Sequence, residues 1–124
     1  MEPKVLIVVV DDEEETCRLL EEFLSSKGYR VFSALTGEKA LQLVKNERPH
    51  LVLLDIRLPD CDGVSLLPQI KGIDREIGVI MVTAVKDEEV AKKTLELGAD
   101  GYVTKPIDFN YLELNILVKL ILQK

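Results

Sequence analysis

The chain has 124 residues and a formal net charge of −6, with 47% hydrophobic against 31% charged residues. This length suits one domain with a single hydrophobic core, and the composition excludes a disordered or fibrous protein. The acidic balance argues against direct binding to nucleic acid, which requires clustered Lys and Arg side chains. We therefore expect one globular domain, residues 1–124, that does not itself bind nucleic acid.

The cysteines and the N-terminal segment indicate the compartment. Cys17 and Cys61 are far apart and form no C-x-x-C pair, so we expect two reduced thiols rather than a disulfide or a thiolate metal site. The first residues show no basic region followed by an apolar stretch, and no apolar run is long enough to span a bilayer. These features predict a cytoplasmic protein that does not contact a membrane.

Short apolar runs alternate with segments of helical period five times along the chain. Residues 5–10 are an unbroken run of Val, Leu and Ile, which is typical of a strand covered on both faces in a parallel sheet. Gly28 and Gly98 each end a helical segment, and Pro68 lies inside another, where proline disfavours a regular helix. In chain order, we expect a strand at 5–10, a helix at 13–27, a strand at 31–34, a helix from 36 to about 46, a strand at 51–54, a helix from 64 to about 71, a strand at 77–82, a helix at 87–97, a strand at 101–103 and a helix from 109 onward.

The alternation of elements predicts the architecture. Strands that alternate with helices form βαβ units and hence a parallel sheet. Right-handed crossovers then place helices on both faces of that sheet. We therefore expect an α/β fold of the doubly wound type with one five-stranded parallel sheet.

Polar side chains gather where the predicted strands end. Asp11 and Asp12 follow the first strand, Asp55 follows the third, Thr83 follows the fourth, and the fifth leads to Lys105. In open parallel sheets, ligands bind in the crevice beyond the carboxyl ends of the strands. Each residue alone has an ordinary explanation, as an acid at a helix start, a cap or a surface lysine. Together they indicate one pocket with three carboxylates, a hydroxyl and an ammonium.

The charges of this set predict its chemistry. Three packed carboxylates repel one another, and that cost must be offset by a cation or by raised pKa values. Oxygen ligands without thiolate or imidazole favour Mg²⁺ or Mn²⁺. Because Mg²⁺ typically uses only one or two carboxylates, one of the three remains free to attack phosphorus. Thr83 and Lys105 would share with the metal the neutralisation of the phosphoryl oxygens. The acids at 13–15 we interpret only as favourable residues in the first turn of a helix.

Four stretches of the sequence resemble a known family: VLIVVVDDEE, LVLLDIRLPDCDG, VIMVTA and GADGYVTKPID. In order and spacing, over essentially the whole chain, they are similar to the receiver domains of two-component response regulators, of which the chemotaxis regulator is a single-domain example. The resemblance implies a flavodoxin-like (βα)5 fold with strand order 2-1-3-4-5. It also implies that the chain is not a turnover enzyme and catalyses only its own aspartyl phosphorylation and dephosphorylation.

The resemblance assigns roles to the acidic residues. Asp55 would be the phosphoacceptor. Asp11 and Asp12 would be the acidic pair that holds Mg²⁺, together with Asp55 and the backbone carbonyl of Arg57. The resemblance therefore implies a reaction that depends on Mg²⁺, with Mn²⁺ as a substitute.

Further positions follow from the same resemblance. Thr83 would turn toward the phosphoryl group, Lys105 would pair with it, and Tyr102 would be the switch aromatic on the fifth strand. The Lys105–Pro106 bond is a candidate cis peptide, which proline permits at modest cost. The donor would be a sensor histidine kinase or a histidine phosphotransfer protein, and the face formed by the fourth helix, fifth strand and fifth helix would change to control an output.

The last helix has an unusually broad apolar surface. At about 100° per residue, its apolar residues cover well over half of the circumference: Leu114, Ile116, Leu117, Val118, Leu120, Ile121 and Leu122. A helix packed on one side of a sheet needs a narrower apolar face. We hypothesise that the surplus contacts a second copy, in a homodimer through the fourth helix, fifth strand and fifth helix, or a following segment. An ordinary apolar helix is the alternative.

Two other functions use similar architectures. A module that binds FMN or a nucleotide would need a loop rich in Gly, Ser or Thr after the first strand, where backbone amides cradle phosphate. This chain has Asp-Asp-Glu-Glu-Glu at that place. A phosphatase with an aspartyl intermediate would carry D-x-D after its first strand, whereas the predicted nucleophile follows the third. We therefore favour the phosphoryl-accepting signalling domain.

Overall fold

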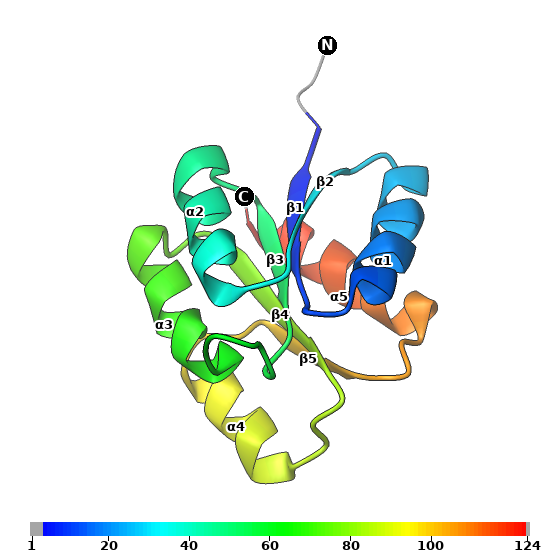
Figure 1. Ribbon diagram of the computed structural model, residues 1–124. Coiled ribbons are helices and arrows are strands. Elements are labelled where there is room, and N and C mark those ends of the chain that lie inside the picture. Colours follow the sequence, from blue (N-terminus) through cyan, green and yellow to red (C-terminus); the bar gives the residue numbers. More distant parts are fainter. Residues whose placement is uncertain (1–3, 124) are drawn as a thin grey trace.

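The computed structural model describes residues 4–123 of the chain (Figure 1). The expected domain, residues 1–124, thus includes residues 1–3 and 124, which lie outside the described part. None of the helices in residues 4–123 combines the length and the apolarity needed to cross a bilayer. The elements are β1 (Leu6–Val10), α1 (Glu14–Ser26), β2 (Arg30–Ala34), α2 (Gly37–Glu47), β3 (Leu51–Leu54), α3 (Gly63–Ile73), β4 (Gly78–Thr83), α4 (Glu88–Glu96), β5 (Gly101–Thr104) and α5 (Phe109–Leu122).

The five strands form one parallel sheet in the order β2-β1-β3-β4-β5, which confirms the predicted fold. The order reverses beside β1, which pairs with both β2 and β3. Val10 lies opposite Leu54 in the register of β1 and β3. Asp11 and Asp55 each follow these paired residues, so the register itself places the two carboxylates at neighbouring strand ends.

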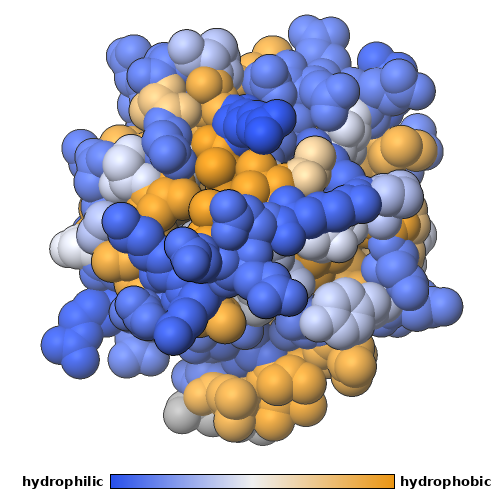
Figure 2. Space-filling model, turned by 90° about the horizontal axis from the view of Figure 1, so that it is seen from below, coloured by the Kyte–Doolittle hydropathy of each residue, from blue (hydrophilic) through white to orange (hydrophobic). Residues whose placement is uncertain are grey.

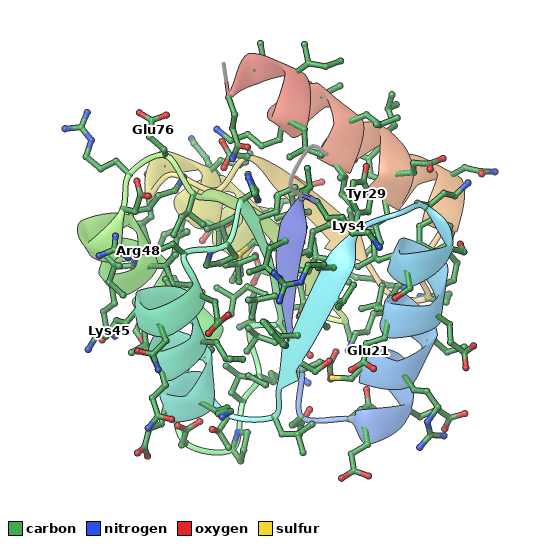
Figure 3. All side chains as sticks on the ribbon, turned by 90° about the horizontal axis from the view of Figure 1, so that it is seen from above. Lys4, Glu21, Tyr29, Lys45, Arg48 and Glu76 are labelled. Atoms are coloured by element: carbon green, nitrogen blue, oxygen red, sulfur yellow. The ribbon has the colours of Figure 1, made fainter. Side chains whose placement is uncertain are left out.

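Helices cover both faces of the sheet (Figure 1). One hydrophobic core lies between the sheet and α1 with α5, and the other lies between the sheet and α2 with α3, with α4 at its margin. The view from above shows α1 and α2 on either side of β2 (Figure 3). There Glu21 of α1 points toward the sheet and accepts a hydrogen bond from the Ser33 hydroxyl (Figure 3). A polar contact thus joins α1 to the edge strand β2.

Element boundaries differ from the predictions by small amounts that have local causes. β4 extends through Thr83, which therefore belongs to the strand rather than to the loop after it. α3 continues past Pro68 to Ile73. Pro68 lacks only the amide that would bond the carbonyl of Val64 in the first turns, so the helix loses one hydrogen bond and is not ended. Leu41, which the helical period places inward, is only half-buried.

The carboxyl ends of the strands meet at the edge that faces downward in Figure 1. The start of α3 approaches this edge closely, and the amide of Gly63 donates a 2.6 Å hydrogen bond to the carbonyl of Ile56. A Cβ atom at Gly63 would overlap the backbone oxygen of Asp55. Only glycine permits α3 to begin so near the end of β3, so the backbone after Asp55 is held in a tight turn.

Candidate functional site

Three aspartates from two strand ends form an acidic cluster. One carboxylate oxygen from each of Asp11, Asp12 and Asp55 lies within 4.8 Å of the others. Asp11 is 2% exposed and Asp55 is 6% exposed, whereas Asp12 faces solvent. The cluster is therefore sunk into the sheet edge and open on the side of Asp12.

Backbone amides fix the orientation of the two buried carboxylates. Asp55 Oδ1 accepts hydrogen bonds from the amide of Ile56 at 2.7 Å and, more weakly, from the amide of Arg57 at 3.4 Å. Asp11 Oδ1 accepts from the amide of Glu13 at 2.9 Å. Each buried carboxylate thus has one oxygen held by the backbone and its second oxygen, Oδ2, turned toward the pocket and Lys105.

The ammonium of Lys105 lies between the two buried carboxylates. Its Nζ donates to Asp11 Oδ2 at 2.6 Å and to Asp55 Oδ2 at 3.1 Å. Burial alone would lower the pKa of Lys105, but the hydrogen bonds to Asp11 and Asp55 outweigh it, and the pKa is raised. Lys105 is therefore a fixed positive charge. The peptide bond that joins it to Pro106 is cis.

The environment of Asp11 opposes its negative charge. Burial raises the pKa of Asp11, and the hydrogen bonds from Lys105 and from the Glu13 amide oppose this rise only in part. The neighbouring charge of Asp55 adds to the rise. A charged Asp11 therefore costs free energy in the folded protein, as expected for crowded carboxylates.

Thr83 and Tyr102 are connected through the backbone of one residue. Thr83 is fully buried at the end of β4, and its Oγ1 accepts a hydrogen bond from the amide of Val85 at 3.3 Å. The carbonyl of Val85 accepts a 2.6 Å hydrogen bond from the hydroxyl of Tyr102 on β5. The loop after β4 thus lies between the pocket and the outer part of β5.

One shallow pocket joins these groups. Seen from below, hydrophilic side chains border a hydrophobic area near the middle of this face of the molecule (Figure 2). All five residues that the sequence analysis assigns to the site meet here: Asp11, Asp12 and Asp55 in the cluster, Lys105 in contact with it, and Thr83 in the wall. Arg57 and Glu13 also line the pocket. Its full lining is Asp12, Glu13, Asp55, Arg57, Thr83, Ala84 and Lys105.

The donor atoms of the pocket suit a hard divalent cation. The three clustered side chains offer carboxylate oxygens only, and neither a cysteine nor the histidine belongs to the cluster among the described residues. Mg²⁺ is commonly held by one or two carboxylates, with water and phosphate oxygens completing its coordination. Because Asp12 opens the cluster to solvent, these residues fit an ion that keeps several waters.

Comparison with known proteins identifies the family. The model of the response regulator receiver domain matches residues 7–117. The chain is a response regulator receiver domain. It is 44% identical over 119 residues to the alkaline phosphatase synthesis transcriptional regulatory protein PhoP of Bacillus subtilis, covering 95% of this chain and 48% of PhoP. It is 40% identical over 104 residues to sporulation initiation phosphotransferase F of the same species, covering 84% of each.

Solved structures agree with this assignment. The receiver domain has a TM-score of 0.93 and 33% identity to a CheY-like receiver from Methanospirillum hungatei JF-1, covering 98% of this chain and 97% of that one. It has a TM-score of 0.88 and 30% identity to a chain of the CheX-CheY-BeF3-Mg²⁺ complex from Borrelia burgdorferi. This match covers 92% of the present chain and 87% of that one. The chain spans about half the length of PhoP and nearly the whole of both receivers. Receiver domains are phosphoryl-accepting signalling domains rather than turnover enzymes.

The structure adds one residue to the receiver pocket that sequence reasoning placed elsewhere. Glu13 is the N-cap residue of α1 and its side chain makes no cap hydrogen bond, but its Oε1 lies 3.4 Å from Lys105 Nζ. Its carboxylate therefore supplements Asp11 and Asp55 around the ammonium. One feature of the sequence could have predicted this role. Glu13 directly follows the Asp11–Asp12 pair, so it lies at the same strand end as the two acids.

Proposed function

We propose that the chain accepts a phosphoryl group on Asp55 from a histidine kinase or a histidine phosphotransfer protein, in a Mg²⁺-dependent reaction. The observation that carries this proposal is the position of Asp55, whose carboxylate lies in the acidic cluster and 3.1 Å from the Lys105 ammonium. A carboxylate beside a metal site and a fixed cation can act as a nucleophile toward phosphorus, because the charges of the incoming phosphoryl group are neutralised.

The reaction needs few protein groups. A carboxylate oxygen of Asp55 forms the new bond to phosphorus, while the bond from phosphorus to the imidazole nitrogen of the donor breaks and the imidazole leaves with the electron pair. Lys105 exchanges part of its contact with Asp55 for the phosphoryl oxygens, and the Thr83 hydroxyl contributes a hydrogen bond to them. A bound Mg²⁺, held by Asp11, Asp12, Asp55 and the backbone carbonyl of Arg57, would supply further neutralising charge. The Borrelia burgdorferi relative, which contains BeF3 and Mg²⁺, supports this assignment.

Intact mass spectrometry tests the acceptor. We expect the parent, incubated with phosphoramidate and Mg²⁺, to gain one phosphoryl group, and to gain none when the metal is chelated. Asp55→Asn should gain none. Asp74→Asn, which changes an aspartate at the far end of α3, should behave like the parent. A gain that persists in Asp55→Asn would contradict the assignment of the acceptor.

We also propose that phosphorylation alters the surface formed by α4, β5 and α5, and that this surface pairs with a second copy of the chain. The Val85 backbone, which contacts both Thr83 and Tyr102, supports a route from the pocket to β5. The outer side of α5 supports the pairing, because six large apolar or aromatic residues are exposed there: Tyr111, Leu114, Leu117, Val118, Ile121 and Leu122. Side chains of α5 project away from the rest of the molecule in Figure 3, and a hydrophobic cluster stands out at the lower margin of Figure 2.

A further inference from the structure

The loop between β3 and α3 is attached to a helix that precedes it in the chain. The two carboxylate oxygens of Asp60 accept hydrogen bonds from the backbone amides of Gly37 at 2.9 Å and Glu38 at 3.0 Å. Gly37 and Glu38 are the first residues of α2, 23 and 22 positions before Asp60. Amides at a helix start have no partner within the helix, and the helix dipole favours a negative charge there.

The charged form of Asp60 is the one that is held. The hydrogen bonds from Gly37 and then Glu38 lower the pKa of this carboxyl below its usual value. Thr36 makes the conventional cap of the same helix, since its hydroxyl accepts from the amide of Lys39 at 3.1 Å. Asp60 therefore supplements an intact local cap, and its own contribution is to join two separate elements.

Close packing accompanies the polar contact. A Cβ atom at Gly37 would overlap Cys61 Sγ, and it would lie 3.0 Å from Leu66 Cδ1 on α3. The loop residue Cys61 and α3 thus pack against the first turn of α2 so closely that a side chain in place of Gly37 would force them to shift. The attachment made by Asp60 is part of a fitted contact and not an isolated surface pair.

The attached loop is the one that carries Arg57. The Arg57 amide points at Asp55 Oδ1, and Arg57 forms an isolated antiparallel bridge with Asp62. The Asp62 side chain in turn caps α3 through the amide of Val64 at 2.8 Å. These contacts hold the loop to Asp55 and to its own helix. Asp60 supplies the contact that holds it to α2.

We propose that Asp60 is a positioning residue for phosphoryl acceptance, which fixes the Arg57 backbone beside Asp55 by joining the β3–α3 loop to the start of α2. The inference rests on the proposed function, in which the Arg57 carbonyl holds the metal. Loss of the Asp60 contact loosens this carbonyl and leaves Asp11, Asp12 and Asp55 in place. Metal affinity then falls, and phosphoryl uptake slows at limiting Mg²⁺ but approaches the parent rate when Mg²⁺ is saturating.

Calorimetric titration with Mn²⁺ tests metal binding directly. We expect Asp60→Ala to raise the dissociation constant for Mn²⁺ about tenfold, the lower end of what is lost when a residue that orients a metal ligand is removed. Asp60→Asn retains one acceptor oxygen for an α2 amide and should recover part of this affinity. Phosphoryl uptake from phosphoramidate, followed by intact mass at several Mg²⁺ concentrations, should show the split between limiting and saturating metal.

Thr36→Ala is the matched control. It removes the other side-chain contact with the start of α2 and weakens that helix, but it leaves the loop attached. We expect its Mn²⁺ affinity to equal that of the parent. Hydrogen exchange at the Arg57 amide should be faster in Asp60→Ala than in Thr36→Ala, because only the former loosens the loop.

The outcomes separate this inference from the proposed function. Parent-like Mn²⁺ binding by Asp60→Ala, or an equal loss in Thr36→Ala, overturns the positioning role. A parent that binds no Mn²⁺ overturns it as well. If the parent binds Mn²⁺ and Asp60→Ala binds it more weakly, but no phosphoryl group appears on Asp55, the proposed function fails while the role of Asp60 in holding the metal ligands stands.

Discussion

The hydroxyl of Tyr102 lies 2.6 Å from the backbone carbonyl of Val85, to which it donates a hydrogen bond. Val85 lies two residues beyond Thr83, and its amide donates to the Thr83 hydroxyl oxygen. The side chains of Thr83 and Tyr102 are therefore linked through the backbone of a single residue. Under the proposed function, a change in the position of Thr83 would reach Tyr102 through these two hydrogen bonds of Val85.

Tyr102→Phe tests that connection. We expect the free energy of unfolding to fall by about 1 kcal/mol, because the Val85 carbonyl loses its partner, while phosphoryl uptake stays at the parent level. The spectral change that BeF3⁻ and Mg²⁺ produce in α4, β5 and α5 should shrink in amide NMR spectra. Tyr29→Phe, on the opposite edge of the sheet beyond α1, should leave that change intact. A full BeF3⁻ response in Tyr102→Phe would show that the hydrogen bond does not carry the signal.

Lys105→Met removes the ammonium between Asp11 and Asp55. Without metal, we expect the free energy of unfolding to fall by about 3 kcal/mol, because two buried carboxylates lose their common partner. Mg²⁺ should restore more stability to this variant than it adds to the parent, since the metal replaces the missing charge. Thermal denaturation with and without Mg²⁺ measures both effects.

Lys119→Met provides the comparison for that experiment. Lys119 pairs with Asp100 at 3.1 Å, and its side chain is 20% exposed against 17% for Lys105. It lies outside the pocket, so its stability loss should not depend on Mg²⁺. An equal Mg²⁺ response in both variants would contradict the role given to Lys105.

Asp11→Asn should stabilise the metal-free protein. Burial raises the pKa of Asp11 above its ordinary value of 3.8, so the charged carboxyl lowers the stability of the fold at pH values above 3.8. An amide has no such cost, and we expect a gain on the order of 1 kcal/mol at neutral pH. The gain should disappear as the pH falls below 3.8, where the carboxyl is protonated in both states. Urea denaturation across this range measures it, and a gain that is independent of pH would contradict the explanation.

Leu114→Glu tests the pairing of two copies. Leu114 is 57% exposed and lines a groove between α5 and Asp100. We expect the parent with BeF3⁻ and Mg²⁺ to sediment as a dimer and Leu114→Glu to remain a monomer, because a charge in an apolar interface is costly. Leu19→Glu on α1, where the leucine is 52% exposed, should dimerise like the parent. A parent that sediments as a monomer both with and without BeF3⁻ and Mg²⁺ would exclude the dimer.

The sequence predicted the sheet well because its strands are covered on both sides. β1, β3 and β4 are buried throughout, and such strands appear as unbroken apolar runs. The edge strand β2 is only partly buried, and it starts at Arg30, one residue before the predicted start. The buried strands β1 and β4 also start one residue away from their predicted starts, so burial reveals a strand but not its exact ends. The pocket followed from the fold, since polar residues at the ends of adjacent parallel strands must meet.

Contacts made by the backbone could not be predicted in the same way. The sequence gives the type of each side chain but not which carbonyl or amide faces it. Val85 offers no polar side chain, yet its backbone joins Thr83 to Tyr102. The sequence does not single out Asp60, and its partners on α2 become visible only when the loop is folded against that helix. Glu13 likewise needed the position of Lys105.

The outer side of α5 shares no side chain with the pocket at the strand ends. Substitutions on that side are therefore expected to leave the chemistry proposed for Asp55 unchanged. Gene duplication followed by divergence of α5 would yield paralogues that receive the same chemical input and address different targets. The separation of the two surfaces would thus allow one chemical input to be read by different targets.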